Sequence, residues 1–169
     1  GYMFREMRRK KQVLSSQECI EILNSGTSGV LAVLGDDDYP YAVPVSYVYH
    51  DDKIFFHGAK KGHRVDAVRK NQKVSFCVVN KDQVAPDEYT NYFRSVIVFG
   101  KAHIMEDELE KRNAINILSK KYAPDHDEEH RQQAIDREYN ATCMIELKIE
   151  HMSGKEAIEL VRSKNSQTN

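Results

Sequence analysis

The sequence predicts one domain of mainly β structure, in which about six antiparallel strands form a barrel with helices around it. Short runs rich in Val, Ile, Phe and Tyr recur along the chain, and several are joined by tight polar turns. Such an order favours an antiparallel barrel over a parallel sheet with helical crossovers. A chain of 169 residues suits one core. We therefore treat 1–169 as a single domain and expect 1–14 and 162–169 to be peripheral.

The composition of the chain disfavours several classes of function. The formal net charge of -1 gives no positive field for nucleic acid. We find no apolar run near the ~20 residues that a membrane span needs. The basic N-terminus has no apolar stretch behind it, so we do not expect a signal peptide. The three cysteines lack metal-ligand spacing and are expected to be buried thiols in a reducing cytosol, which predicts a cytoplasmic protein without a metal site.

The first half of the chain carries clear start and stop signals. Ser15 and Glu18 have the spacing of a capping box, which predicts a helix that Gly26 can end. The pair Asp51–Asp52 between two apolar runs predicts a hairpin turn. The strands expected in this half are 29–34, 41–49 and 53–57, followed by a helix over 61–70.

The second half is expected to hold three more strands. These are 73–79, 92–105 and 141–150, and Gly100 inside the second of them suggests a bulge. We expect a loop over 80–91 around Pro86. A helix over 106–122 has an acidic start and a basic end, which suit the helix dipole. A charged loop at 125–129 and a short helix follow. The chain is expected to end in a helix over 153–161 and a disordered tail after Arg162.

A basic, glycine-punctuated cluster follows the third expected strand. A phosphate dianion needs cations and backbone N–H donors, and a helix start provides the donors with a favourable dipole. Gly58 and Gly62 let the backbone approach a ligand closely. The candidate phosphate ligands are Lys60, Lys61, His63 and Arg64. This pattern points to a flavin mononucleotide (FMN) site, whereas the alternative is a solvated basic turn before a surface helix.

Pro44 interrupts the second expected strand. Because proline cannot donate to the strand ladder, this stretch lies at an edge or is locally unpaired. Free backbone groups there could meet the polar edge of a flavin ring, beside Val45, Ser46 and Tyr47. A plain edge strand is the alternative.

His57 ends the third strand and is the candidate catalytic residue. A histidine there can donate a hydrogen bond or move a proton, or it can be purely structural. One strand residue advances ~3.3 Å, so His57 and Arg64 were expected to serve opposite ends of a flavin. His126 and His130 lie in an Asp/Glu-rich loop, where solvation is favoured over metal binding.

Taken together, these segments resemble the nitroimidazole-resistance proteins, which belong to the pyridoxamine-phosphate-oxidase-like flavin-binding split barrels. Residues 39–49 (YPYAVPVSYVY), 56–59 (FHGA) and 62–64 (GHR) carry the likeness. Residues 92–100 (YFRSVIVFG) and 149–156 (IEHMSGKE) add two later motifs.

The resemblance implies a six-stranded split barrel and a homodimer with FMN at the subunit interface. It places the cofactor against two groups within one chain and against a third group from the partner. These are Pro44, Val45, Ser46 and Tyr47 at the ring edge; Lys60, Lys61, His63 and Arg64 at the phosphate, with Gly58 and Ala59 just before them; and Arg94, Ser95 and Lys155 from the partner. His57 corresponds to the family's active-site histidine and is expected to face the reactive side of the flavin ring.

Three functions compete. The first is an FMN-dependent reductase of nitroaromatic or related small electrophiles, in which His57 positions or protonates the substrate. The second is a binding protein that holds flavin or haem without turnover, with His57, His63, His103 or His151 as iron ligand. The third is pyridoxamine-phosphate oxidation. It is disfavoured because the family's second-strand Arg is missing and Lys-Lys-Gly-His-Arg replaces its Ser-Arg-Lys group.

Overall fold

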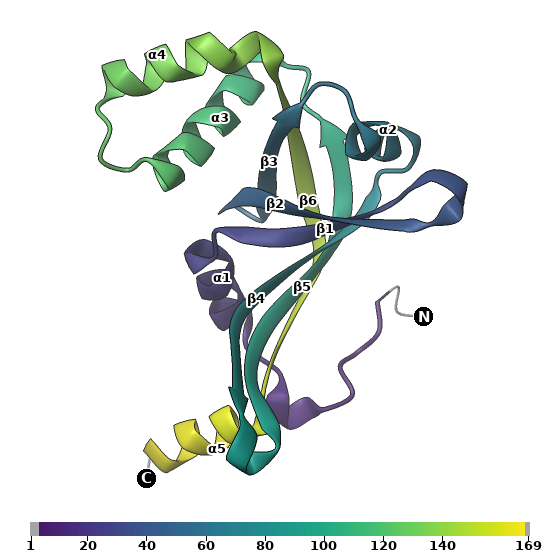
Figure 1. Ribbon diagram of the computed structural model, residues 1–169, viewed down its shortest axis with the longest axis vertical. Coiled ribbons are helices and arrows are strands. Elements are labelled where there is room, and N and C mark those ends of the chain that lie inside the picture. The colour runs from purple at the N-terminus through teal and green to yellow at the C-terminus, as the bar shows by residue number, and fades with distance from the viewer. Residues whose placement is uncertain (1–3, 168–169) are drawn as a thin grey trace.

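The computed structural model describes residues 4–167 and shows six antiparallel strands closed into a barrel, with helices outside it (Figure 1). The strand order around the barrel is β1-β2-β3-β6-β5-β4. The strands are β1 (Ser28–Leu34), β2 (Pro40–His50), β3 (Lys53–Ala59), β4 (Lys73–Ala85), β5 (Thr90–Ile104) and β6 (Thr142–Glu156). The helices are α1 (Ser16–Ser25), α2 (His63–Lys70), α3 (Glu108–Tyr122), α4 (Glu128–Glu138) and α5 (Ile158–Gln167). The predicted split-barrel class is confirmed.

Local signals in the sequence have the expected structural effect. The side chain of Ser15 accepts from the Glu18 N–H and the Glu18 carboxylate accepts from the Ser15 N–H, which completes the capping box of α1. Asp51 and Asp52 have φ angles of 47° and 59°, as a tight β-hairpin turn requires. The β5–β6 register shifts at Gly100, where an added Cβ would overlap the Lys148 carbonyl, so the predicted bulge is confirmed.

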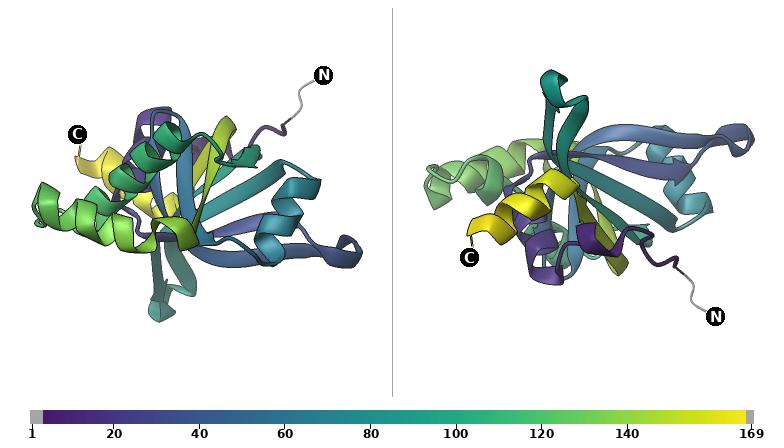
Figure 2. Two further views of the ribbon diagram at one scale, coloured as in Figure 1. Left: turned by 90° about the horizontal axis from the view of Figure 1, so that it is seen from above. Right: turned by 90° about the horizontal axis from the view of Figure 1, so that it is seen from below.

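Two apolar clusters hold the barrel and its helices. The barrel interior packs the rings of Tyr47 and Phe56 edge-on against Phe76, with centroids 4.9 and 5.2 Å away. Outside the barrel, a second cluster joins α3 and α4 to the strands. It contains Val48, Phe55, Met105, Ala114, Ile115, Leu118, Ile135 and Met144. Figure 2 shows these two helices lying together against one side of the barrel.

The barrel opens where β2 changes partner. Up to Ser46 β2 pairs with β1, and from Tyr47 onward it pairs with β3. The last residues of β3, His57 to Ala59, pair only with β6. The facing edges of β2 and β3 therefore part beside Pro44, and this gap positions the candidate site.

The loop predicted over 80–91 is wrong. β4 and β5 continue through it as a long hairpin arm that stands out from the barrel, with a single 3-10 turn at Pro86–Glu88 (Figures 1 and 2). Both faces of the arm meet solvent, as the 69% exposed Val84 and 97% exposed Tyr89 show. Without a buried face, the sequence has no alternation that could have indicated strands.

The predicted C-terminal boundary is also wrong. β6 continues to Glu156 because Arg94 and Ser95 of β5 pair with its last residues, and the helix begins only at Ile158. The tail expected to be disordered is helical to Gln167. Lys164 anchors it through 2.7 Å contacts with Glu18 and Glu156. Residues 168–169 lie outside the described residues.

The segment before α1 lies against the sheet. Leu14 is buried and its N–H donates to the Gly154 carbonyl at 2.9 Å, and Val13 bridges to Lys155. Between residues 4 and 167, no helix combines the length and apolar character needed to cross a bilayer.

Candidate functional site

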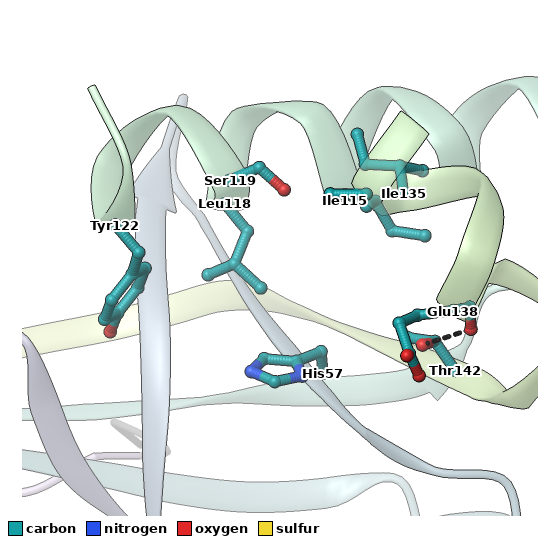
Figure 3. Close-up of a pocket in the computed structure, with 9 residues that line it drawn as sticks. His57, Ile115, Leu118, Ser119, Tyr122, Ile135, Glu138 and Thr142 are labelled. Atoms are coloured by element: carbon teal, nitrogen blue, oxygen red, sulfur yellow. Dashed lines mark hydrogen bonds between the residues drawn. The ribbon is translucent and has the colours of Figure 1, made fainter. Parts of the chain in front are cut away.

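A cavity of about 270 Å³ lies between the end of β3 and the helix pair α3–α4. His57 forms its floor beneath the aliphatic side chains of Ile115, Leu118 and Ile135 (Figure 3). Tyr122 lies at one end and Glu138 with Thr142 at the other. Ser119 and Ala134 complete the lining. The cavity is thus an apolar chamber with one imidazole and a polar rim.

His57 keeps an exposed edge although it lines this chamber. Its pKa is lowered, first because partial burial disfavours the charged imidazolium and second because the Arg64 guanidinium is near. The neutral imidazole therefore persists to lower pH than usual. In that form it offers one N–H donor and one acceptor to a bound molecule.

Arg64 lies directly over Gly58. A Cβ added at Gly58 would overlap the Arg64 guanidinium, so a larger residue at this position would displace the end of the Arg64 side chain. Because successive side chains of a strand point to opposite faces, the guanidinium over Gly58 and the imidazole of His57 lie on opposite faces of β3, near enough for the Arg64 charge to lower the His57 pKa. That the two residues serve opposite ends of a flavin stays a prediction.

The start of α2 has the features of an anion site. Gly62 precedes the helix with φ 147°, and no side chain caps the first N–H groups. Lys60 and Lys61 are exposed, and within residues 4–167 neither they nor Arg64 form an ion pair. Three cations without an ion pair among the described residues therefore lie within residues 60–64 at an uncapped helix start.

His63 does not join this cluster. Its ring stacks on Tyr41 with centroids 4.0 Å apart, and its Nε2 accepts from the Asp36 N–H at 3.2 Å. The side chain thus fastens α2 to the β1–β2 turn. The sequence motif suggested a phosphate ligand, but the structure gives His63 a structural contact.

The four residues predicted to lie at the flavin ring edge alternate along β2 between exposed and buried side chains. Pro44 and Ser46 are exposed on the open edge of β2, whereas the side chains of Val45 and Tyr47 are buried. The Tyr47 hydroxyl donates to the Leu23 carbonyl at 2.6 Å, and burial raises its pKa. Tyr47 is therefore a core residue and its side chain is not free for a ligand.

The end of α3 occupies the backbone of Tyr47. The Tyr47 N–H donates to the Tyr122 hydroxyl at 3.0 Å, and the Lys121 ammonium donates to the Tyr47 carbonyl at 3.1 Å. Lys121 also donates to the Gly26 carbonyl, and Tyr122 to the Thr27 carbonyl. Sequence reasoning assigned Lys121 only to the helix dipole. These contacts, which we call the α3 pin, could not be predicted from the sequence because the partners are more than 70 residues away.

Tyr122→Phe should lower the free energy of unfolding by about 1 kcal/mol, since it leaves the Tyr47 N–H without its partner. Urea denaturation should show an earlier midpoint with an unchanged slope. Tyr92→Phe is the matched control because its hydroxyl bonds the exposed Glu88 on the β4–β5 arm, and it should change little. Equal effects of the two variants would contradict the pin.

Lys121 should give stability a distinct pH dependence. Burial lowers its pKa from 10.5 to about 8. Between these values the unfolded chain binds more protons than the folded one, so this group's contribution to stability should rise as pH increases from about 8 toward 10.5. Denaturation at pH 7 to 10, as the difference between native protein and Lys121→Met, should show this rise. A pH-independent difference would contradict the shift.

The three residues expected to reach the flavin from a partner subunit lie on opposite faces of the β5–β6 pair. Arg94 binds the buried Glu156 carboxylate at 3.2 Å, on the face that packs against α1 and α5. Ser95 and Lys155 pair on the opposite face and line a separate cavity. Within one chain none of them reaches the His57 chamber. Arg94 is therefore assigned to the structural network.

The sequence did not predict the aliphatic residues that cover the chamber opposite His57, called its roof below. In the sequence, Ile115 and Leu118 are only apolar positions of the helix expected over 106–122, and Ile135, Glu138 and Thr142 belong to no motif. The helical insertion between β5 and β6 places them over His57. The rings of His126 and His130 lie close together at the start of α4, with centroids 4.2 Å apart and planes tilted by 40°. Across residues 4–167, no group of three His, Cys, Asp or Glu side chains converges on a common point.

A protein-family model and several solved structures match this chain. The family model described as pyridoxamine 5'-phosphate oxidase matches residues 15–156. No curated protein gives a significant match.

Solved structures share the fold. A candidate 5-nitroimidazole antibiotic resistance protein from Bacteroides thetaiotaomicron is 20% identical, with a TM-score of 0.72 over 85% of this chain and 86% of that one. A conserved hypothetical protein from Mycobacterium tuberculosis is 20% identical, with a TM-score of 0.77 over 89% and 90%. A FAD-binding protein from Mesorhizobium loti is 26% identical, with a TM-score of 0.62 over 86% and 95%.

Proposed function

This chain belongs to the pyridoxamine 5'-phosphate oxidase family, and we propose that it is an FMN-binding oxidoreductase that reduces nitroaromatic or related small electrophiles. The observation that carries the proposal is the adjacency of two sites. An uncapped helix start follows the end of β3 and carries three cations for which no ion pair is found among residues 4–167, and the apolar chamber floored by His57 lies at that same strand end. The first suits a phosphate and the second suits a small planar molecule.

The residues at the end of β3 fit a flavin phosphate. Arg64 would bind phosphate oxygens with its guanidinium fork, while Lys60 and Lys61 would supply charge. The free N–H groups of α2 would complete the cradle. One compact cluster suits one phosphate, which favours FMN over a dinucleotide. The 26% identical relative is described as FAD-binding, so identification of the cofactor released from purified protein tests this choice.

The chamber is assigned to the substrate. Ligand pockets generally measure about 300 to 1,000 Å³, so a cavity of about 270 Å³ holds a single small ring rather than a whole flavin. Bound FMN supplies electron and hydride transfer. Leu118 and Ile135 would exclude water from the ring of an acceptor. His57 would donate a hydrogen bond to the acceptor's polar group or move a proton there.

The competing functions have less support. Pyridoxamine-phosphate oxidation stays disfavoured because β2 carries no Arg between Pro40 and His50. Binding without turnover differs from the proposal in a measurable way. Anaerobic stopped-flow of FMN-loaded protein with NADH or NADPH, followed by a nitroimidazole, should show reduction and then reoxidation of the flavin absorbance. A spectrum that never responds to the acceptor would favour a storage or sensing role.

The protein is expected to be a homodimer. The outer face of the barrel exposes Val30, Ile97 and Phe99 at 41%, 42% and 38%, and strand pairing places Val30, Cys77 and Ile97 in one row. Contiguous apolar surface of this kind marks an interface. Light scattering of flavin-loaded protein at micromolar concentration should give twice the chain mass. A monomer with flavin bound would contradict this expectation.

A further inference from the structure

The His57 chamber has a polar end for which the proposed function gives no use. Glu138 and Thr142 lie at this end, opposite Tyr122, and Figure 3 shows the Glu138 carboxylate turned inward on the same side as the His57 ring. Glu138 is the last residue of α4 and is exposed overall, so ligands can reach its carboxylate at the rim. A molecule bound beneath the aliphatic roof would therefore meet a negative group beside the imidazole.

The chamber carries a net negative charge. Among the described residues that line it, Glu138 is the only acidic side chain, and no Lys or Arg is found with it. Burial and the nearby Arg64 charge lower the His57 pKa, so the imidazole is neutral at neutral pH. The Arg64 guanidinium itself lies over Gly58, on the opposite face of β3. Within the described lining, no positive group balances the Glu138 carboxylate.

The Glu138 carboxylate also lacks a counter-ion elsewhere in the described chain. No ion pair of Glu138 is found among residues 4–167, and the neighbouring Arg137 is not part of the lining. A carboxylate at the C-terminal end of a helix faces the negative end of the helix dipole, so it does not stabilise α4. The Thr142 hydroxyl donates to the Glu138 carbonyl at 2.7 Å and holds the backbone in place at this point. A cation bound here would relieve the unfavourable charge.

We propose that Glu138 selects the substrate: the chamber takes small aromatic electrophiles that carry a positively charged amine and disfavours those that carry a carboxylate. This inference rests on the proposed function, because it places the electron acceptor in the chamber. The aromatic ring would lie between the roof and His57, with its reducible group at His57 and the Ser119 hydroxyl and its ammonium at Glu138. Opposite charges attract more strongly beside apolar walls, and a like charge placed there is repelled, so one residue supplies both preferences.

Two nitro compounds of opposite charge test the selection. 4-Nitrobenzylamine and 4-nitrobenzoate share the ring and the nitro group, and anaerobic kinetics of flavin-loaded protein should give a kcat/KM about tenfold higher or more for the amine. Glu138→Gln keeps the shape of the side chain and removes its charge, so it should lower this ratio about fivefold or more. The matched control is Glu129→Gln, the same change at an exposed position of α4 outside the lining, which should leave the ratio within about twofold of native.

A binding measurement separates this proposal from the proposed function. Benzylamine and benzoate have no nitro group, so their binding requires neither electron transfer nor a bound flavin. Ligand-observed NMR titrations of the purified protein, with and without added FMN, should show tighter binding of benzylamine than of benzoate. The preference should persist in Glu129→Gln and be lost in Glu138→Gln.

The possible outcomes keep the two proposals apart. Equal kcat/KM for the two nitro compounds, or a ratio that Glu138→Gln and Glu129→Gln lower equally, would overturn the selection while nitro reduction itself supported the proposed function. Absence of nitro reduction, together with a benzylamine preference that depends on Glu138, would reject the proposed function and support Glu138 as the residue that selects amines. A native protein that binds benzoate as well as benzylamine, or better, would overturn the selection in either case.

Discussion

Replacement of His57 by Ala should lower turnover of a nitroaromatic acceptor by about 10²- to 10⁴-fold, the usual contribution of a positioned acid–base group. His57 floors the chamber and its lowered pKa keeps the imidazole neutral, with an N–H free to donate. Flavin affinity should stay within a few-fold of native. Steady-state kinetics under anaerobic conditions, with flavin content measured in parallel, separates the two quantities.

His103→Ala is the matched control for this variant. His103 is another strand-end histidine, 3.7 Å from the Glu146 carboxylate and outside the chamber lining, so its loss should leave turnover within about twofold. His57→Gln restores a hydrogen-bond donor without a titratable group and should recover part of the rate. Retained turnover with loss of flavin would instead assign His57 to the phosphate site, which lies beside it through Arg64. No change in either quantity would make His57 a structural residue.

The sequence predicted those parts of the fold whose causes are local. The capping box of α1 and the hairpin turn at Asp51–Asp52 involve neighbours in the chain, so their residue types were sufficient. The bulge at Gly100 was predicted for the same reason, since a missing side chain in a strand indicates a close backbone approach. The strands that have one buried face were also predicted, because apolar and polar residues alternate along them.

Features that depend on distant partners were not predicted. The β4–β5 arm has no buried face and so no alternation, and α5 extends because Lys164 meets Glu18 across 146 residues of sequence. His63 lies in the right motif but contacts Tyr41, and only the folded β1–β2 turn shows this.

The residues of the candidate site show the same contrast between local and distant causes. The basic cluster and His57 are contiguous in sequence and were predicted together. The aliphatic roof comes from two helices that start 51 and 71 residues after His57, and an apolar helix face in sequence does not reveal what it covers. Free backbone groups were expected around Pro44, with Tyr47 beside them, but those of Tyr47 are not free. Instead Lys121 and Tyr122 bind them, because α3 folds back over the opening between β2 and β3.

Arg64→Ala should weaken FMN binding by about tenfold to a hundredfold. A hydrogen bond to a charged group contributes about 1.5–3 kcal/mol, and each 1.4 kcal/mol is a factor of ten in affinity. Arg64 is half-buried at the start of α2 and its guanidinium lies over Gly58, at the end of β3 where we propose that the phosphate binds. Equilibrium titration of the apoprotein, monitored by flavin fluorescence, measures the change.

Two further variants make this last test specific. Arg69→Ala removes the same charge from the exposed end of α2 and should change FMN affinity less than about twofold. Gly58→Ala keeps the charge but displaces the guanidinium, because the new Cβ would overlap it, and should weaken FMN binding less than Arg64→Ala does. If Arg64→Ala and Arg69→Ala weakened binding equally, the effect would be general electrostatics. If Arg64→Ala left the affinity unchanged, the flavin phosphate would not lie at the end of β3.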